Sequence, residues 1–174
     1  LANGDVVAVK IQRPGVKATM ALDIDIMRMV ARQASRFMKD DQMLDLRDVV
    51  EELWATFLEE TDFQREAANL EEFARLNKGV AFIDCPKVHT ELVMEYIDGI
   101  PILATDRLRK AGYDLEEIGE KILDNYASQI LDHGFFHADP HPGNLLVRSG
   151  KIVYIDLGIM GRLSPRDRAG FCNI

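Results

Sequence analysis

Polar residues near the C-terminal end constrain the fold of this chain more than any other feature of its sequence. Residues 137–144 have the sequence His-Ala-Asp-Pro-His-Pro-Gly-Asn, and an Asp-Leu-Gly triplet follows at residues 156–158. Apolar runs on both sides of a Ser-Gly pair separate the two segments, a pattern that predicts two strands joined by a tight turn. Such a hairpin would hold the polar ends of both segments close together.

Both segments contain the residue types that transfer of a phosphoryl group from a nucleotide requires. Asp139 and Asn144 lie five positions apart on a loop, so their side chains can turn toward one point. A carboxylate in this place can orient an acceptor hydroxyl, while an amide oxygen and the second carboxylate of Asp156 can hold a metal ion. Oxygen ligands suit Mg²⁺ rather than zinc. In the alternative interpretation Asp139 and Asn144 only cap turns. In either case His137 is predicted to have a structural role, bonded to backbone near this loop, and not to act as an acid or base.

The first half of the chain has the periodicity of a mixed helix and strand protein. A β-branched strand over residues 5–11 precedes two helical runs, over residues 16–39 and 45–77, and the second run is long enough to predict a break near residues 60–63. Two short strands are predicted within residues 87–96, before a linker that contains Gly and Pro.

A further helix is predicted to begin after Asp114 and to end at Gly134. Asp114 can cap this helix together with Glu117, three residues later. Its predicted buried residues are Ile118, Ile122, Ala127, Ile130 and Leu131. Another helix is predicted to start at the Ser-Pro pair of residues 164–165.

Three stretches of sequence follow one another along the chain. They are Val-Ala-Val-Lys-Ile-Gln-Arg-Pro-Gly-Val at 7–16, Glu-Thr-Asp-Phe-Gln-Arg-Glu-Ala-Ala-Asn at 60–69, and Gly-Phe-Phe-His-Ala-Asp-Pro-His-Pro-Gly-Asn at 134–144. The third resembles the catalytic loop of kinases, and residues 156–158 are similar to their metal-binding Asp-Phe-Gly element. Together the three stretches resemble the UbiB family of atypical kinases, which is linked to coenzyme Q biosynthesis.

This resemblance implies an α+β fold of the protein-kinase-like, two-lobe type. A small antiparallel sheet with long helices would occupy residues 1–98, and a helical lobe with the catalytic loop would occupy residues 99–174. Nucleotide would bind between the lobes, with Glu95 in the hinge. Since the chain begins in mid-strand at Leu1, we expect a piece of a longer protein.

The resemblance also implies the roles of individual residues. Asp139 would orient the phosphoryl acceptor, and Asn144 and Asp156 would bind Mg²⁺ and, through it, ATP. Lys10, in a Val-Ala-Val-Lys motif, would contact the nucleotide phosphates and pair with a helix glutamate, for which we predict Glu66.

Two other acidic residues compete for the partnership with Lys10. Glu60 and Asp62 match a Glu-x-Asp motif of the family, which resembles a contact site for an N-terminal segment in relatives. Residues six apart on a helix point about 120° from each other, so only one of Glu60 and Glu66 can face the same cleft. Alternation along the strand predicts Lys10 on the side opposite the aliphatic residues, among them Val9.

Composition limits the kinds of protein that this sequence can be. Its net charge of -8 argues against general affinity for nucleic acid, and its 47% hydrophobic content is enough for the core of a soluble, globular domain. The two cysteines, Cys85 and Cys172, lack the spacing of a metal site, which predicts structural thiols. No apolar run is long enough for a transmembrane segment. We therefore expect a cytoplasmic or membrane-peripheral protein, with any membrane segment outside this sequence.

Three functions remain at this stage. The first is an atypical kinase or ATPase of the UbiB type that supports quinone lipid biosynthesis, with lipids or quinone-biosynthesis proteins as partners. The second is a small-molecule phosphotransferase similar to aminoglycoside or choline kinases, since aminoglycoside phosphotransferases share the His-Pro-Gly-Asn sequence. The third is a nucleotide-binding pseudokinase scaffold. The 60–69 stretch favours the first function over the second, and the complete set of catalytic and metal-binding residues disfavours the third.

Overall fold

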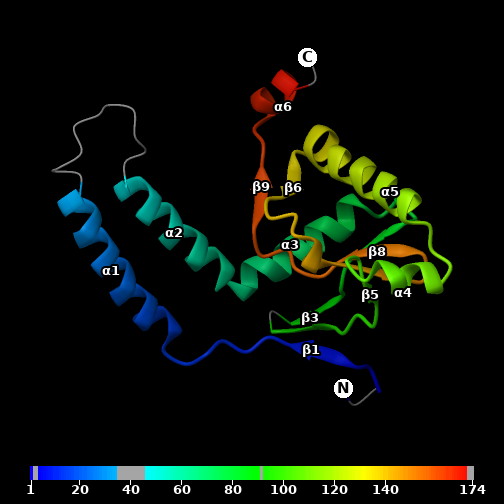
Figure 1. The fold of residues 1–174 in the computed structure, drawn as a ribbon, viewed down its shortest axis with the longest axis horizontal. Helices are drawn as coiled ribbons and strands as arrows, with labels where there is room; N and C mark the ends of the chain where they lie inside the picture. Colours follow the sequence, from blue (N-terminus) through cyan, green and yellow to red (C-terminus); the bar gives the residue numbers. More distant parts are fainter. Residues whose placement is uncertain (2–3, 35–45, 91, 172–174) are drawn as a thin grey trace. The chain divides into compact units, whose positions relative to one another are not determined.

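The computed structural model describes residues 1, 4–34, 46–90 and 92–171 (Figure 1). The chain forms two compact units, one made of Leu1–Val9 with Phe63–Ile174 and the other of Lys10–Asp62. The lobe boundary that the sequence predicts after residue 98 falls inside the first unit, and the division into lobes stays a prediction.

The Lys10–Asp62 unit is a hairpin of two helices. Helix α1 (Val16–Ala34) packs against α2 (Leu46–Glu60) through a small apolar core. The core residues are Ile24, Ala31 and Val50, with Met20 and Trp54 beside them. The Arg28 guanidinium holds both carboxylate oxygens of Glu51 at 2.7 Å, which ties the two helices together on their outer side. The remainder of the predicted 16–39 helix lies outside the described residues.

The predicted break in the second helical run is confirmed. Helix α2 ends at Glu60, and α3 (Phe63–Leu76) begins after two non-helical residues. At the break, the Thr61 hydroxyl donates to the backbone carbonyls of Phe57 and Leu58. The Phe57 carbonyl also accepts the Thr61 backbone N–H, so the hydroxyl is an additional donor to the carbonyls at the end of α2.

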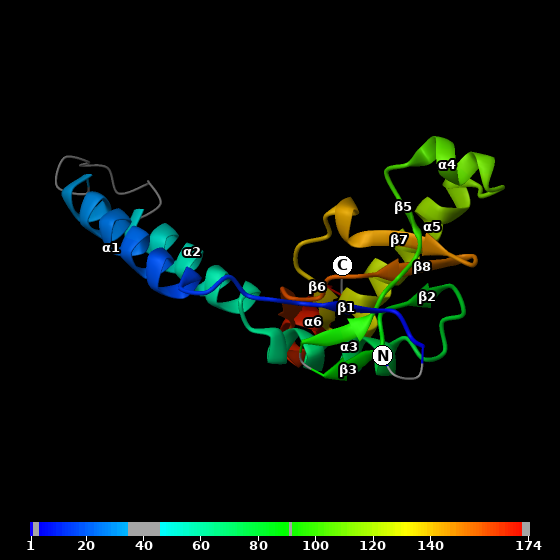
Figure 2. The same cartoon turned by 90° about the horizontal axis from the view of Figure 1, so that it is seen from below.

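Most of the strands in the first unit belong to two sheets. The three-stranded sheet has the order β1 (Val7–Val9), β4 (Val93–Glu95), β3 (Val88–Thr90), with antiparallel pairing throughout. The four-stranded sheet, seen in Figure 2, has the order β2 (Ile83–Asp84), β8 (Lys151–Tyr154), β7 (Leu145–Arg148), β5 (Ile100–Pro101). Only β2 and β8 pair in parallel. The very short strands β2 and β5 are missing from the sequence-based prediction.

The β7–β8 hairpin matches its prediction. Its turn residues, Ser149 and Gly150, have φ values of 51° and 78°. Two successive left-handed residues are typical of the tight turn whose twist suits an antiparallel pair. Leu145 pairs with Tyr154 at the open end of the hairpin. The polar segment 137–144 ends just before this pair, and the Asp-Leu-Gly triplet follows just after it.

Helices and a third, two-stranded sheet complete the first unit. They are α4 (Thr105–Lys110), α5 (Leu115–Ser128), a π-helical turn (Gln129–His133), β6 (Phe135–His137), a 3-10 turn (Pro142–Asn144), β9 (Met160–Arg162) and α6 (Pro165–Phe171). Strands β6 and β9 pair antiparallel.

The predicted cap of α5 is confirmed for Asp114, whose side chain accepts a hydrogen bond from the Glu116 backbone N–H, while Glu117, predicted to complete the cap, instead accepts from Lys121. Gly134 ends the helical region in the left-handed conformation, as predicted.

The predicted buried face of α5 is wrong in part. Ile118 is buried, but Ala127 and Leu131 are exposed, while Asn125 and Gln129 are buried. Ile118, Ile122, Asn125 and Gln129 are spaced by four, three and four residues, which is the spacing of one helix face. Packing therefore selected a face that includes two polar residues, which an apolar pattern alone could not indicate.

The core of the first unit gathers around α3 and the four-stranded sheet. Phe73 of α3 lies against Tyr154 of β8, with ring centroids 5.0 Å apart. Leu70, Leu108, Ile152 and Leu157 are each at most 1% exposed within the same cluster. The predicted structural role of Cys85 is supported, because its thiol is buried here, and burial together with the charges of Asp84 and Glu95 raises the pKa of that thiol to about 12. Cys172 lies outside the described residues.

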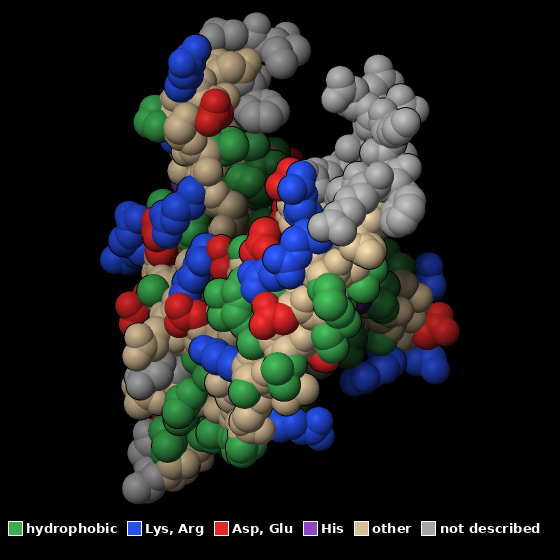
Figure 3. Space-filling model, turned by 90° about the vertical axis from the view of Figure 1, so that its left-hand side faces the viewer, with side chains coloured by type: hydrophobic (Ala, Val, Ile, Leu, Met, Phe, Trp, Pro, Cys, Tyr) green, Lys and Arg blue, Asp and Glu red, His purple; other side chains and the backbone are tan. Residues whose placement is uncertain are grey.

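Surface charges are mixed in sign. On the face shown in Figure 3, Lys and Arg side chains are interspersed with Asp and Glu and do not form a broad basic patch. This mixture of signs agrees with the acidic balance of the sequence. Within the described ranges, none of the helices combines the length and apolar character that crossing a membrane requires.

Candidate active site

The loop after β6 is folded by its own hydrogen bonds. The His141 backbone N–H donates to the Asp139 carbonyl at 2.7 Å, and the Asn144 N–H donates to the His141 carbonyl at 2.9 Å. The His141 ring accepts the Gly143 N–H at its Nδ1 atom, at 3.0 Å. These bonds hold Asp139 and Asn144 on one compact turn, as the sequence predicts.

The β7–β8 hairpin brings Asn144 beside the Asp-Leu-Gly triplet. The Ile155 N–H donates to the Asn144 carbonyl at 3.0 Å, so the residue before Asp156 lies directly opposite Asn144. One Asp156 oxygen, Oδ1, accepts the Gly158 N–H at 3.0 Å. The two predicted metal ligands therefore lie at the same end of one hairpin.

The side chains of the three motif residues are left open for a ligand. Among the described residues, neither the Asp139 carboxylate, nor the Asn144 amide, nor Asp156 Oδ2 has a hydrogen-bond or ion-pair partner. Asn144 and Asp156 are half-buried. Asp139 is exposed, so the oxygens of all three side chains are accessible to a ligand.

These oxygens fit Mg²⁺ bound together with phosphate. No group of three or more His, Cys, Asp or Glu side chains that could hold a metal occurs in the part of the chain that the structure describes. Mg²⁺, however, is usually bound by one or two protein oxygens, with phosphate and water oxygens filling its other positions. Asn144 and Asp156 supply such a pair.

Helix α3 holds the Asp-Leu-Gly triplet through a hydrogen bond to its backbone. The Asn69 amide Nδ2 donates to the Leu157 carbonyl at 2.8 Å, and both residues are buried. The Leu157 side chain is 0% exposed. It therefore fills an apolar site while the adjacent Asp156 remains partly accessible.

His137 has the structural role that the sequence predicts. It is 2% exposed, and its Nδ1 accepts the Asp139 backbone N–H at 3.1 Å. Burial lowers the pKa of His137, while the Asp156 backbone and the charges of Asp156 and Asp139 oppose that effect. A neutral imidazole with Nδ1 as acceptor fixes the direction in which the loop leaves β6.

The predicted ion pair of Lys10 and Glu66 stays a prediction. Glu66 lies on α3 and is 4% exposed, while Lys10 directly follows β1, is half-buried and belongs to the Lys10–Asp62 unit. The rival candidate, Glu60, is exposed at the end of α2.

The expected aliphatic face of β1 is wrong. Ala8 packs against the main core, and Val9 is 56% exposed. The alternation is present, but its packed side carries the smaller side chain of Ala8, and nothing in β-branched character alone tells which side a core will cover.

The Glu95 carboxylate already has protein partners. Its Oε1 lies 2.7 Å from Nη1 of Arg148 in an ion pair, and its Oε2 accepts the Lys87 backbone N–H at 3.3 Å. Side-chain binding of nucleotide at Glu95 would break this ion pair. The predicted hinge contact is therefore better suited to the backbone of this segment.

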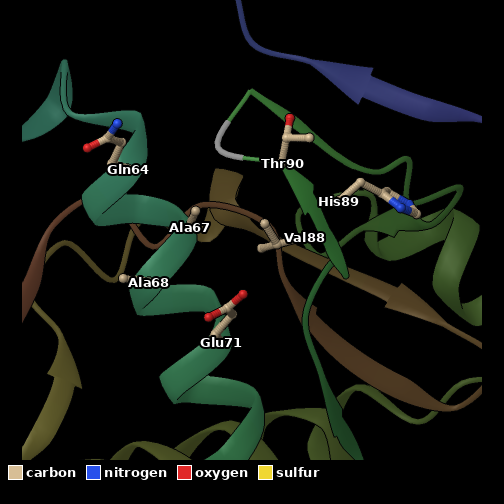
Figure 4. Close-up of a pocket in the computed structure, with 7 residues that line it drawn as sticks. All are labelled: Gln64, Ala67, Ala68, Glu71, Val88, His89 and Thr90. Atoms are coloured by element: carbon tan, nitrogen blue, oxygen red, sulfur yellow. The ribbon is translucent and has the colours of Figure 1, made fainter.

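Two cavities lie away from the motif residues. The one in Figure 4, about 370 Å³, lies between α3 and β3 and is lined by Gln64, Ala67, Ala68, Glu71, Val88, His89 and Thr90. The other, about 280 Å³, is lined by residues 98–100, by residues of α4 and the segment after it, and by residues of the β7–β8 hairpin. None of the residues predicted to bind ATP or Mg²⁺ lines either cavity.

Relatives of the chain are found among bacterial and plant proteins. A Marinobacter nauticus protein described as "Probable protein kinase UbiB" is 34% identical over 180 residues, which cover 97% of this chain and 33% of that protein. The Arabidopsis thaliana protein "ACTIVITY OF BC1 COMPLEX KINASE 8, chloroplastic" is 35% identical over 96% of this chain and 23% of its own length. A Clostridium pasteurianum protein without an assigned function is 42% identical over 94% of this chain. The chain thus spans a third or less of the length of these relatives.

A solved structure has the same fold. The Mycobacterium tuberculosis protein Rv3197, determined in complex with erythromycin, superposes with a TM-score of 0.75 at 26% sequence identity, over 92% of this chain and 41% of that one. Residues 1–174 also match the family model of the ABC1 atypical kinase-like domain. The resemblance to UbiB and the kinase-like α+β fold are both confirmed, and the chain belongs to the ABC1 atypical kinase-like family.

Proposed function

We propose that this chain is the ATP-binding part of a Mg²⁺-dependent atypical kinase or ATPase of the UbiB type. The observation that carries the proposal is the unused oxygens of Asp139, Asn144 and Asp156 on one loop and hairpin end. Asn125 and Gln129, buried amides nearby, are by contrast hydrogen-bonded to other protein groups. The accessible oxygens of the three motif residues, close together in one place, support a site that a ligand can enter.

Each motif residue has one task in this proposal. Asp139 orients the hydroxyl or water that accepts the phosphoryl group. Asn144 and Asp156 hold Mg²⁺, which when bound offsets the negative charge of the phosphate oxygens. Lys10, paired with Glu66, contacts the nucleotide phosphates.

The biological setting is proposed from the relatives. A relative named "Probable protein kinase UbiB" supports a UbiB-type activity. The resemblance to the UbiB family implies a role in quinone lipid biosynthesis, at the cytoplasmic or membrane-peripheral location expected from the sequence, with lipids or quinone-biosynthesis proteins as partners. The two alternatives are a small-molecule phosphotransferase and a pseudokinase scaffold. The first would transfer phosphate to an aminoglycoside or choline, and the second would bind nucleotide without consuming it.

Calorimetric titration of ATP into the purified protein, with and without Mg²⁺, tests the proposal. Asp156→Ala should weaken binding of Mg-ATP roughly 5- to 150-fold, because a charged ligand interaction contributes about 1 to 3 kcal/mol. It should have little effect on ATP alone. Asp124→Ala, which removes an exposed carboxylate of α5, is the matched control. Equal Mg-ATP affinity of Asp156→Ala and the parent would reject the metal assignment.

Formation of ADP from ATP, measured alone and with choline, aminoglycoside or quinone-lipid acceptors, separates the three functions. Turnover with water or lipid supports the UbiB-type activity. Turnover only with choline or aminoglycoside would support the phosphotransferase, and Mg-ATP binding without turnover would support the pseudokinase.

A further inference from the structure

A chain of buried amides connects α3 to the catalytic loop. Asn77 Nδ2 donates to the Phe73 carbonyl at 3.0 Å, Asn125 Nδ2 donates to Asn77 Oδ1 at 2.7 Å, and Gln129 Nε2 donates to Asn125 Oδ1 at 2.8 Å. Gln129 Oε1 then accepts the backbone N–H of His137 at 3.0 Å. Asn77, Asn125 and Gln129, which we call the amide relay, are 6%, 3% and 0% exposed.

The two ends of the amide relay fix the orientation of every member. The Phe73 carbonyl can only accept and the His137 N–H can only donate, so each amide must turn its nitrogen toward α3 and its oxygen toward the loop. Every member is therefore both donor and acceptor. A carboxylate or an apolar side chain at any position would interrupt the chain.

Gln129 forms hydrogen bonds on both sides of the turn that leads from the α5 region into β6. Its backbone carbonyl accepts the Gly134 N–H across the π-helical turn, and its side chain accepts the His137 N–H. Gly134 has a φ of 62°, which a residue with a side chain adopts only with strain. Gln129 therefore bonds to the backbone at the end of the π-helical turn through its carbonyl and to the backbone of β6 through its side chain.

Gln129 and Tyr126 also complete the free edge of β6. On one edge, β6 pairs with β9. On the other, Gln129 binds the His137 N–H, and the Tyr126 hydroxyl donates to the His137 carbonyl at 2.8 Å. Two side chains of the α5 region therefore replace a neighbouring strand at the residue from which the Asp139 loop departs.

The same helix α3 also holds the metal-binding triplet and the strand after it. Asn69 donates to the Leu157 carbonyl, as described above, and Glu72 forms a paired ion bridge with Arg162 of β9. Burying three amides costs more than filling the same space with apolar side chains would, unless all their hydrogen bonds are made. A fully bonded chain fixes one geometry, which an apolar cluster does not.

We infer that Asn77, Asn125 and Gln129 are positioning residues that hold His137, and with it the Asp139 loop, at a fixed place relative to α3. Only the expected effect on turnover rests on the proposed function; the positioning role of the amide relay does not. The amide relay makes no contact with the unused oxygens of Asp139, Asn144 and Asp156. Its loss should therefore change turnover and leave nucleotide affinity nearly intact.

Gln129→Met and Gln129→Glu test the inference together. Turnover of Gln129→Met should fall at least tenfold at all pH values, with the Mg-ATP dissociation constant within threefold of the parent. Gln129→Glu should be equally slow at neutral pH but recover as the pH falls, because a protonated carboxyl can donate to Asn125 and still accept from His137. Ile122→Ala, on the same helix, removes core packing without touching the relay and should leave both turnover and the pH profile unchanged.

Hydrogen exchange of the 134–139 segment provides a readout that does not depend on activity. In Gln129→Met, the exchange rate of this segment should rise at least tenfold more than the loss of global stability accounts for. In Ile122→Ala, the exchange rate should rise only as much as the loss of global stability accounts for. Parent-like exchange and parent-like turnover in Gln129→Met would overturn the inference. If the parent itself neither binds nor consumes ATP, the proposed function fails, while the exchange experiment still decides the role of the relay.

Discussion

Asn69 of α3 donates its amide N–H to the backbone carbonyl of Leu157 over 2.8 Å, across 88 residues of sequence. Leu157 is the central residue of the triplet that carries Asp156. The helix that bears Glu66 therefore also holds the loop of the predicted metal ligand. Movement of α3 along its axis would disturb both.

Asn69→Leu should lower the free energy of unfolding by about 1 to 3 kcal/mol, because it leaves the buried Leu157 carbonyl without a donor. It should also weaken Mg-ATP binding more than binding of ATP alone. Urea unfolding and calorimetry measure the two effects. The control is Ala68→Ser at the exposed neighbouring position, which should change neither. Parent-like stability of Asn69→Leu would show that this bond contributes little.

Asp139→Asn should slow ATP consumption at least tenfold, equivalent to about 1.4 kcal/mol of activation free energy, and spare ATP binding. The reason is that an amide cannot accept the proton of an acceptor hydroxyl, although it has the same shape. Steady-state ADP formation and nucleotide titration check the two halves of this prediction. A rate within about threefold of the parent would exclude Asp139 as the orienting base.

Lys10→Met should weaken binding of ATP, and a double-mutant cycle identifies its partner. If Lys10 pairs with Glu66, Lys10→Met combined with Glu66→Gln should show an interaction energy of about 0.5 to 3 kcal/mol in nucleotide binding, as contacting residues do. The matched cycle with Glu60→Gln should show none. Coupling to Glu60 in place of Glu66 would move the active-site glutamate to the Glu-x-Asp motif.

The Glu72–Arg162 bridge should contribute to stability only above acidic pH. The hydrogen bonds and charge of Arg162, with a smaller contribution from Arg75, hold the pKa of Glu72 below its ordinary value. A carboxyl with a lowered native pKa stabilises the fold above its unfolded pKa, and that stabilisation is lost as the pH falls through the native pKa.

Arg162→Gln should therefore reduce the free energy of unfolding at neutral pH by up to about 1 kcal/mol, since the arginine is 60% exposed and the pair is partly screened by solvent. The difference between variant and parent should disappear under acidic conditions that protonate Glu72. Urea unfolding across the acidic range measures it. An undiminished difference in acid would mean that Arg162 stabilises mainly through its contact with the Phe135 ring.

Local sequence predicted the elements whose formation depends on neighbours in the chain. The break before α3, the cap at Asp114, the end at Gly134 and the β7–β8 turn are set by residues within a few positions of one another. The strands β2 and β5, with two residues each, form only because β8 and β7 provide their partners. Periodicity cannot indicate so short a strand.

The sequence by itself determined the family, the kinase-like fold and the spacing that puts Asn144 and Asp156 at one end of a hairpin. The tertiary structure alone decided which polar residues are buried. Asn77 and Asn125 are 48 positions apart, and Asn125 and Gln129 occupy the same helix face as Ile118, which was the one available sign in the sequence. A buried amide and a surface amide have the same local pattern, because the hydrogen-bond partners that make burial favourable are supplied by distant segments that only the folded chain brings together.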